Sequence, residues 1–111
     1  MRDWLVPLEE FEANLGRDGK RFWVGLRHGT MSVELFAPQG RDTQQPHARD
    51  ELYIVLRGTG TFSRRGEVRL VSAGDVIFVP AGAEHRFETF SDDFATWVIF
   101  WGPEGGEKEE G

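Results

Sequence analysis

Residues 74–85 read GDVIFVPAGAEH. Within this stretch the run Val76–Val79 is apolar and β-forming, and it is enclosed between a Gly-Asp pair and a Pro-Ala-Gly segment. That pattern is typical of a short strand between two tight turns. His85 follows the second turn directly, at the start of another apolar run. The stretch therefore predicts two consecutive strands of a β domain, the second opening with a histidine.

The same rhythm runs along the chain from Lys20 onward, as short apolar and β-branched runs closed by glycine, proline or charged residues. It predicts eight strands, at residues 21–27, 31–37, 51–57, 60–64, 67–71, 76–79, 85–90 and 94–101. So many short strands in one small chain are typical of a sandwich or barrel. We expect an all-β fold, a jelly-roll barrel.

Composition limits the classes of function. A length of 111 residues suits one domain, and 39% hydrophobic residues are enough for a core. The absence of cysteine excludes thiolate chemistry and fits a reducing compartment, and no apolar run approaches the roughly 20 residues of a membrane helix. The net charge of −6 disfavours nucleic acid and anionic membranes. We expect a cytoplasmic protein whose partner is a small molecule or a second copy.

Three regions are expected: an N-terminal arm packed on the barrel (1–16), the barrel itself (17–102) and a flexible acidic tail (103–111). The arm offers four apolar side chains for packing, those of Trp4, Leu5, Leu8 and Phe11. The run 94–101 is apolar on both alternating faces, so both faces need cover from the arm, a second sheet or a partner subunit. We expect a homodimer.

The spacing around His85 resembles the second signature of the cupin superfamily. Gly74, Pro80, Gly82 and His85 stand at the family's spacing, and Thr89 replaces the asparagine that closes the signature. This resemblance implies a double-stranded β-helix, the jelly-roll barrel of cupins, with a metal in the barrel mouth.

The segment 45–58 resembles the first cupin signature in part. Glu51 and Gly58 keep the family's spacing, His47 takes the place of the second histidine, and Gln45 stands where the family has the first. The resemblance implies that His47, Glu51 and His85 are metal ligands. Gln45 is a fourth candidate, either as a neutral ligand or as a hydrogen-bond partner of metal-bound water, unless the neighbouring Gln44 is the glutamine that points inward.

Strand periodicity supports this ligand set. Because side chains alternate, Glu51 shares a face with Tyr53, and His85 shares a face with Thr89. A carboxylate in an apolar interior needs a partner, and a cation provides one. Two imidazoles and a carboxylate suit one divalent ion of iron, manganese, nickel, zinc or copper. Tyr53 and Thr89 either donate hydrogen bonds into the pocket or pack across strands.

Other polar residues are assigned to the surface. His28 lies in a predicted hairpin turn, and Arg49, Asp50 and Arg86 have the opposite strand parity to the ligands. Three hypotheses of function stay open: a mononuclear metal enzyme, an oxygenase or isomerase acting on a small organic molecule; a non-catalytic binding or sensing module, with or without metal; and a barrel whose pocket is filled by aromatic residues without metal.

Overall fold

The computed structural model describes residues 4–108. Its elements are α1 (Leu8–Asn14), a 3-10 helix (Arg17–Gly19), β1 (Phe22–His28), β2 (Met31–Phe36), β3 (Asp50–Arg57), β4 (Thr59–Arg64), β5 (Glu67–Ser72), β6 (Val76–Val79), β7 (His85–Phe90) and β8 (Ala95–Trp101). All eight predicted strands are confirmed, each end within one residue of its expected position. Within the described range, no helix is long and apolar enough to cross a membrane.

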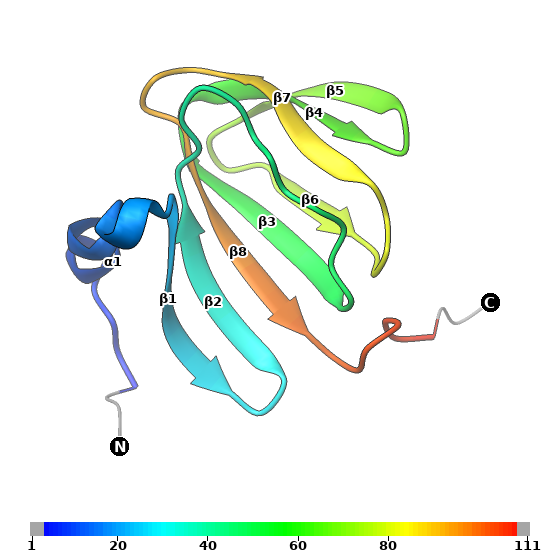
Figure 1. Cartoon of the computed structure of the whole chain (residues 1–111), viewed down its shortest axis with the longest axis horizontal. Coiled ribbons are helices and arrows are strands. Elements are labelled where there is room, and N and C mark those ends of the chain that lie inside the picture. The colour runs from blue at the N-terminus through cyan, green and yellow to red at the C-terminus, as the bar shows by residue number, and fades with distance from the viewer. Residues whose placement is uncertain (1–3, 109–111) are drawn as a thin grey trace.

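The strands form two antiparallel sheets that face each other (Figure 1). The larger sheet has the order β1-β2-β8-β3-β6, and the smaller has the order β5-β4-β7. This confirms the all-β, jelly-roll prediction. Glu51 lies on β3 in the larger sheet and His85 opens β7 in the smaller one, so the topology brings these two side chains together across the barrel interior.

The aromatic core lies between the two sheets. Tyr53, Phe87 and Phe94 are at most 2% exposed, and the rings of Tyr53 and Phe87 meet edge to face at 5.1 Å between centroids. Such edge-to-face pairs are favourable beyond the area that they bury. This core extends as far as His85, whose ring lies 6.0 Å from that of Tyr53 between centroids.

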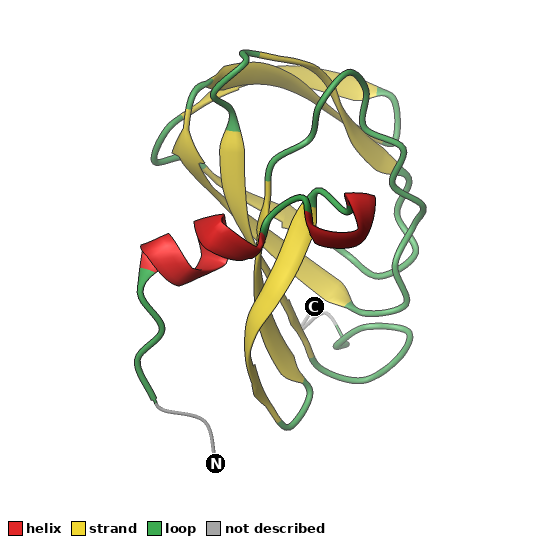
Figure 2. Cartoon of the chain, turned by 60° about the vertical axis from the view of Figure 1, so that its left-hand side comes forward, coloured by secondary structure: helices red, strands yellow, loops and turns green. Residues whose placement is uncertain are grey.

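A second core lies outside the barrel, where α1 covers β1 and β2 (Figure 2). Phe11 of α1 is 3% exposed, and its ring packs edge to face against Trp23 and Trp97. Trp97 and Val98 therefore face two different cores, which explains why β8 is apolar on both faces.

The N-terminal arm packs only in part. Phe11 and Leu8 join the outer core as expected, but Trp4 is 86% exposed and Leu5 is 58% exposed, so their expected burial is wrong. Trp4 and Leu5 precede the helix, which begins at Leu8, whereas Val6 between them and Pro7 packs against the outer core.

The beginning of the acidic tail is attached to the barrel. Asp50 is 4% exposed, and its carboxylate accepts hydrogen bonds from the backbone N–H groups of Ala81 (3.0 Å) and Glu107 (2.8 Å). The interpretation of Asp50 as a surface residue is wrong, because the tail covers its side of β3. Within the expected flexible tail, 103–111, the structure thus places Glu107 against the barrel, and residues 109–111 lie outside the described part.

Candidate metal centre

Three of the predicted ligands converge in the structure. His47 comes from the loop before β3, Glu51 from β3 and His85 from the first position of β7. One nitrogen or oxygen of each side chain lies within 4.8 Å of the others. Glu51 and His85 are 1% and 3% exposed, so the cluster lies at the inner end of the barrel mouth.

The atoms that face one another in this cluster lack hydrogen-bond partners. Among residues 4–108, none forms a hydrogen bond with Nε2 of His47, Nε2 of His85 or either carboxylate oxygen of Glu51. Nε2 of His85 and Oε1 of Glu51 are 3.0 Å apart, close enough for an ion pair but without hydrogen-bond angles. Buried polar atoms are costly without partners, so this donor set fits a cation well.

The other ring nitrogen of His85 fixes the orientation of the imidazole. Nδ1 lies 2.8 Å from the backbone oxygen of Ala83, which can only accept, so Nδ1 carries a hydrogen and a neutral ring presents the Nε2 lone pair to the cluster. Burial lowers the pKa of His85, but the Glu51 carboxylate and the Ala83 carbonyl raise it, and the net pKa lies above the ordinary value of 6.5. Without a metal, the ring therefore tends to be protonated beside Glu51.

The loop that carries His47 is tied to the turn before His85. The N–H of Gly82 donates to the backbone oxygen of His47 at 2.7 Å. The ring of His47 packs edge to face on Phe100 of β8, at 4.7 Å between centroids. These contacts position a loop residue beside two strand residues.

A chain of hydrogen bonds supports the same loop from inside. The hydroxyl of Tyr53 donates to Oε1 of Gln44 (2.9 Å), and Nε2 of Gln44 donates to Oδ2 of Asp42 (2.7 Å). Oδ2 of Asp42 also accepts from the N–H of Phe87 on β7 (2.9 Å). Burial, and then the charge of Glu51, raise the pKa of Tyr53 well above its ordinary value, so the phenol stays a donor. The chain thus joins the His47 loop to both ligand-bearing strands.

Sequence reasoning did not identify Asp42 as part of this hydrogen-bond network. For the glutamine it named Gln45, with Gln44 as the alternative. Gln45, the fourth predicted ligand, is exposed, whereas Gln44 turns inward. The backbone N–H of Gln44 donates to Oδ1 of Asp42 (3.0 Å), a turn that the Asp-Thr-Gln sequence could have indicated. Thr89 is also exposed and pairs with Thr61 at 2.8 Å, which is cross-strand packing.

A cavity of about 390 Å³ borders the cluster through His47, and we name it the entrance pocket. Its wall comes from β1, β2, β8 and the loop before β3, and includes Arg21, Glu34, Arg41, Gln44, His47 and Phe100. The volume suits a small organic molecule.

Glu34 of β2 is a residue of this pocket that sequence reasoning did not single out. Its carboxyl group forms no hydrogen bond or ion pair with any residue of the described range. Burial, and then the charge of Glu51, outweigh the attraction of Arg27 and raise its pKa from 4.5 to about 7. Glu34 can therefore hold or release a proton near neutral pH.

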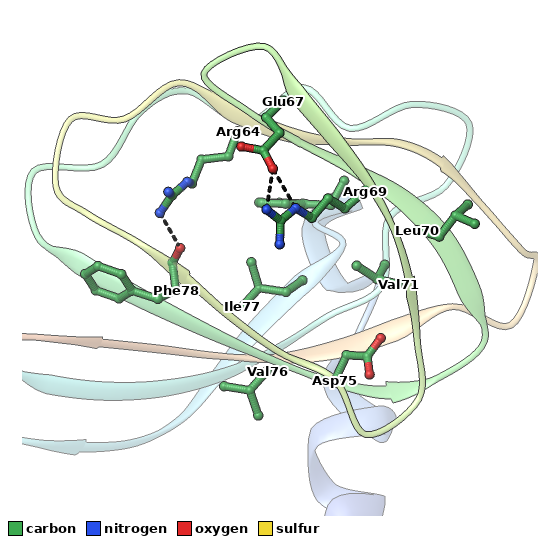
Figure 3. A pocket seen from close by; sticks show the side chains of 10 residues that line it. Arg64, Glu67, Arg69, Leu70, Val71, Asp75, Val76, Ile77 and Phe78 are labelled. Atoms are coloured by element: carbon green, nitrogen blue, oxygen red, sulfur yellow. Dashed lines mark hydrogen bonds and ion pairs between the residues drawn. The ribbon is translucent and has the colours of Figure 1, made fainter.

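A separate cavity of about 440 Å³ lies between β5 and β6 and contains none of the three clustered residues (Figure 3). Arg69 pairs with Glu67 there, and Arg64 donates to the backbone oxygen of Phe78 at 3.1 Å. The convergent unpartnered groups lie in the barrel mouth, so we place the candidate centre there.

Comparisons with known proteins agree with this fold. The chain is 37% identical to the uncharacterized protein SCO3923 of Streptomyces coelicolor over 99 residues, which is 87% of this chain and 94% of that protein. Among solved structures, a Cupin 2 conserved barrel domain protein from Salinispora arenicola matches with a TM-score of 0.70 and 23% identity, covering 92% of this chain and 91% of that one. KdgF from a Halomonas species matches with a TM-score of 0.64 and 20% identity, covering 72% of this chain and 76% of that one. The family model described as the cupin domain matches residues 32–101, and the chain therefore belongs to the cupin family.

Proposed function

We propose that this cupin is a mononuclear metal enzyme, an oxygenase or isomerase, in which His47, Glu51 and His85 hold one divalent ion and a small organic molecule binds in the entrance pocket. The observation that carries the proposal is the set of buried, unpartnered atoms that these residues direct at one another. Gln45 is exposed, so we assign three protein ligands and leave the remaining coordination positions to water or substrate.

When bound, such an ion supplies Lewis acidity toward an oxygen atom of the ligand. The residues of this chain supply the rest. The Ala83 carbonyl holds His85 in the tautomer that binds metal. The hydrogen bonds through Gln44 and Tyr53 hold the loop of His47 in place. Glu34, which lines the same pocket as His47, can hold or release a proton near neutral pH. This unpartnered carboxyl group favours an enzyme over a module that only binds a ligand.

Metal analysis tests the ligand set. Protein purified without a histidine tag and reloaded with each candidate ion should hold one ion per chain, whereas His47→Ala, Glu51→Gln and His85→Ala should hold much less. His28→Ala is the matched control, because His28 is an exposed residue at the end of β1. Wild-type protein that cannot be reloaded to stoichiometry would contradict the proposal.

Turnover distinguishes an enzyme from a binding module. Metal-loaded wild-type protein should consume oxygen with a member of a panel of catechols, thiols and diketones, or interconvert isomers of a hydroxycarbonyl compound. Glu34→Gln should lose most of this turnover while still holding metal. A protein that binds panel members without turning any of them over would support the binding module instead.

We also propose that the protein is a homodimer. Leu70 on β5 and Val76 and Phe78 on β6 are 85%, 63% and 44% exposed, and both strands stand at the end of their sheets. Exposed apolar side chains beside sheet edges favour association. Light scattering should give twice the mass of the chain, and Leu70→Glu should lower it. A monomeric mass for the wild type at every concentration would rule the dimer out.

A further inference from the structure

Two arginines line the entrance pocket. Arg21 and Arg41 both line the cavity, and neither forms an ion pair with a carboxylate among residues 4–108. In a chain with 19 acidic against 13 basic residues, two such guanidinium groups at one cavity form a local positive site.

Arg21 is held in position rather than free to move away. Its Nε donates to the backbone oxygen of Ala37 at 2.9 Å, and the N–H of Ala37 donates back to the backbone oxygen of Arg21 at 2.9 Å. This reciprocal pair anchors the start of β1 to the end of β2. It also leaves the terminal nitrogens of Arg21 free of any hydrogen bond to another described residue. A held guanidinium with unused donors matches carboxylate or phosphate oxygens.

Among the described residues, the acidic groups of the pocket do not pair with either arginine. The Asp42 carboxylate already accepts three hydrogen bonds, from the N–H and Nε2 of Gln44 and from the N–H of Phe87. Glu34 has a pKa of about 7, so it is largely uncharged at mildly acidic pH. The remaining wall is mainly apolar and includes Phe36 and Phe100. Positive charge at the rim and apolar surface inside are complementary to a compact organic anion.

We propose that the entrance pocket binds a small organic molecule that carries a carboxylate or phosphate group, with Arg21 and Arg41 holding the anionic group and the carbon skeleton directed toward His47. The proposal rests on the metal centre proposed above, because it assigns the substrate of that site. Both arginines act as binding and specificity-determining residues, and neither has a part in holding metal.

The test is calorimetric titration with two sets of matched probes: benzoate, phenyl phosphate and benzamide on an aromatic skeleton, and gluconate, glucose 6-phosphate and glucose on a six-carbon skeleton. Each is titrated into metal-free protein, where no carboxylate can bind through a metal, and into metal-loaded protein. In at least one set, an anion should bind about tenfold more tightly than its neutral counterpart, because hydrogen bonds to charged groups are stronger than those to neutral groups. Comparison of the carboxylate with the phosphate identifies which anionic group is preferred.

Arg21→Gln and Arg41→Gln should each weaken binding of the anion about tenfold and leave binding of the neutral probe unchanged. Arg69→Gln is the matched control, because it removes the same charge at the cavity between β5 and β6. Arg21→Lys controls for misfolding caused by loss of the Ala37 contact. It should recover part of the anion affinity that Arg21→Gln loses. Arg41 is exposed, and no hydrogen bond or ion pair of its side chain to another described residue would be lost in Arg41→Gln.

The outcomes separate this proposal from the metal assignment. Arginine-dependent anion binding to a protein that takes up no metal would support the pocket and overturn the metal centre. Stoichiometric metal with equal affinity for anions and neutral probes would overturn the anion site alone. Failure of every anion to bind, or anion affinity that Arg21→Gln and Arg41→Gln leave unchanged, would also overturn it.

Discussion

Nε2 of His85 lies 3.0 Å from Oε1 of Glu51, with both side chains only 1% exposed. Without a metal, the Glu51 carboxylate favours an imidazolium beside it, and together with the Ala83 carbonyl this holds the pKa of His85 above 6.5 despite burial. With a metal, both atoms become ligands and the proton must leave. A rise in pH therefore weakens the interaction between these two atoms in the metal-free protein, but it favours their binding of a metal.

Metal-free protein should lose stability as the pH rises above about 6.5. A histidine whose pKa is raised by folding contributes stability below its unfolded pKa, and that contribution disappears as the pH rises through the folded pKa. Metal affinity should instead rise over this interval, because protons compete with the ion for His85. Urea unfolding between about pH 5.5 and 8.5, with and without metal, measures both effects.

The matched control for this prediction is His85→Gln, which should flatten the stability profile of the metal-free protein. Both proteins are best compared in a Glu34→Gln background, because Glu34 titrates near the same pH. A metal-free stability that rises between about pH 6.5 and 8 would contradict the assigned role of the pair.

Asp50→Asn should loosen the turn that precedes His85. The two oxygens of Asp50 each accept one N–H group, that of Ala81 and that of Glu107. An amide has only one oxygen, and its nitrogen cannot accept, so at least one buried donor loses its partner. The loss should cost about 1–3 kcal/mol. Hydrogen exchange should become faster at both amides, and metal affinity should fall. Asp92→Asn, at an exposed turn position, is the control. Unchanged exchange at Ala81 would show that Asp50 does not hold this turn.

The strands and two of the clustered residues could be predicted from the sequence because each depends on a local signal. Glycine and proline divide the chain into runs of strand length, and the period of two places Glu51 and His85 on inward faces. The convergence of His47 with them was expected from the family resemblance, since a loop residue has no periodicity. The structure confirms that the three lie together.

The wrong placement of Asp50 and the oversight of Glu34 have a common physical origin, because both depend on a segment distant in sequence. Strand parity correctly places Asp50 opposite Glu51, but only the tail, which covers Asp50, buries it. In β2 the apolar residues Val33 and Leu35 flank Glu34, so alternation alone would turn Glu34 toward solvent. Those two residues pack in the core with α1 instead, and Glu34 faces the entrance pocket. No local pattern indicates which face of this strand the helix covers.

Phe11→Ala should destabilise the fold without removing the metal centre. Phe11 is 3% exposed between Trp23 and Trp97, and truncation of a buried phenylalanine costs about 3–5 kcal/mol. The outer core lies on the opposite face of the larger sheet from Glu51, so the folded fraction should keep its metal stoichiometry. Leu5→Ala, at a 58% exposed position, should change the free energy of unfolding little. A folded Phe11→Ala protein that cannot hold metal would show that the helix supports the site.

Glu34→Gln should stabilise the metal-free protein at alkaline pH. Because folding raises the pKa of this carboxyl group from 4.5 to about 7, the folded state retains its proton longer than the unfolded state, and stability is lost as the pH rises through this interval. The uncharged amide has the same shape and avoids that loss, so the gain should be up to about 3 kcal/mol at about pH 8 and should vanish below about pH 4.5. Urea unfolding of the two proteins across this range measures the difference. Glu88→Gln, at an exposed position of β7, should follow the wild-type profile. If Glu34→Gln also follows it, the carboxyl group is charged in the folded protein at neutral pH and cannot serve as the proton-holding group of the pocket.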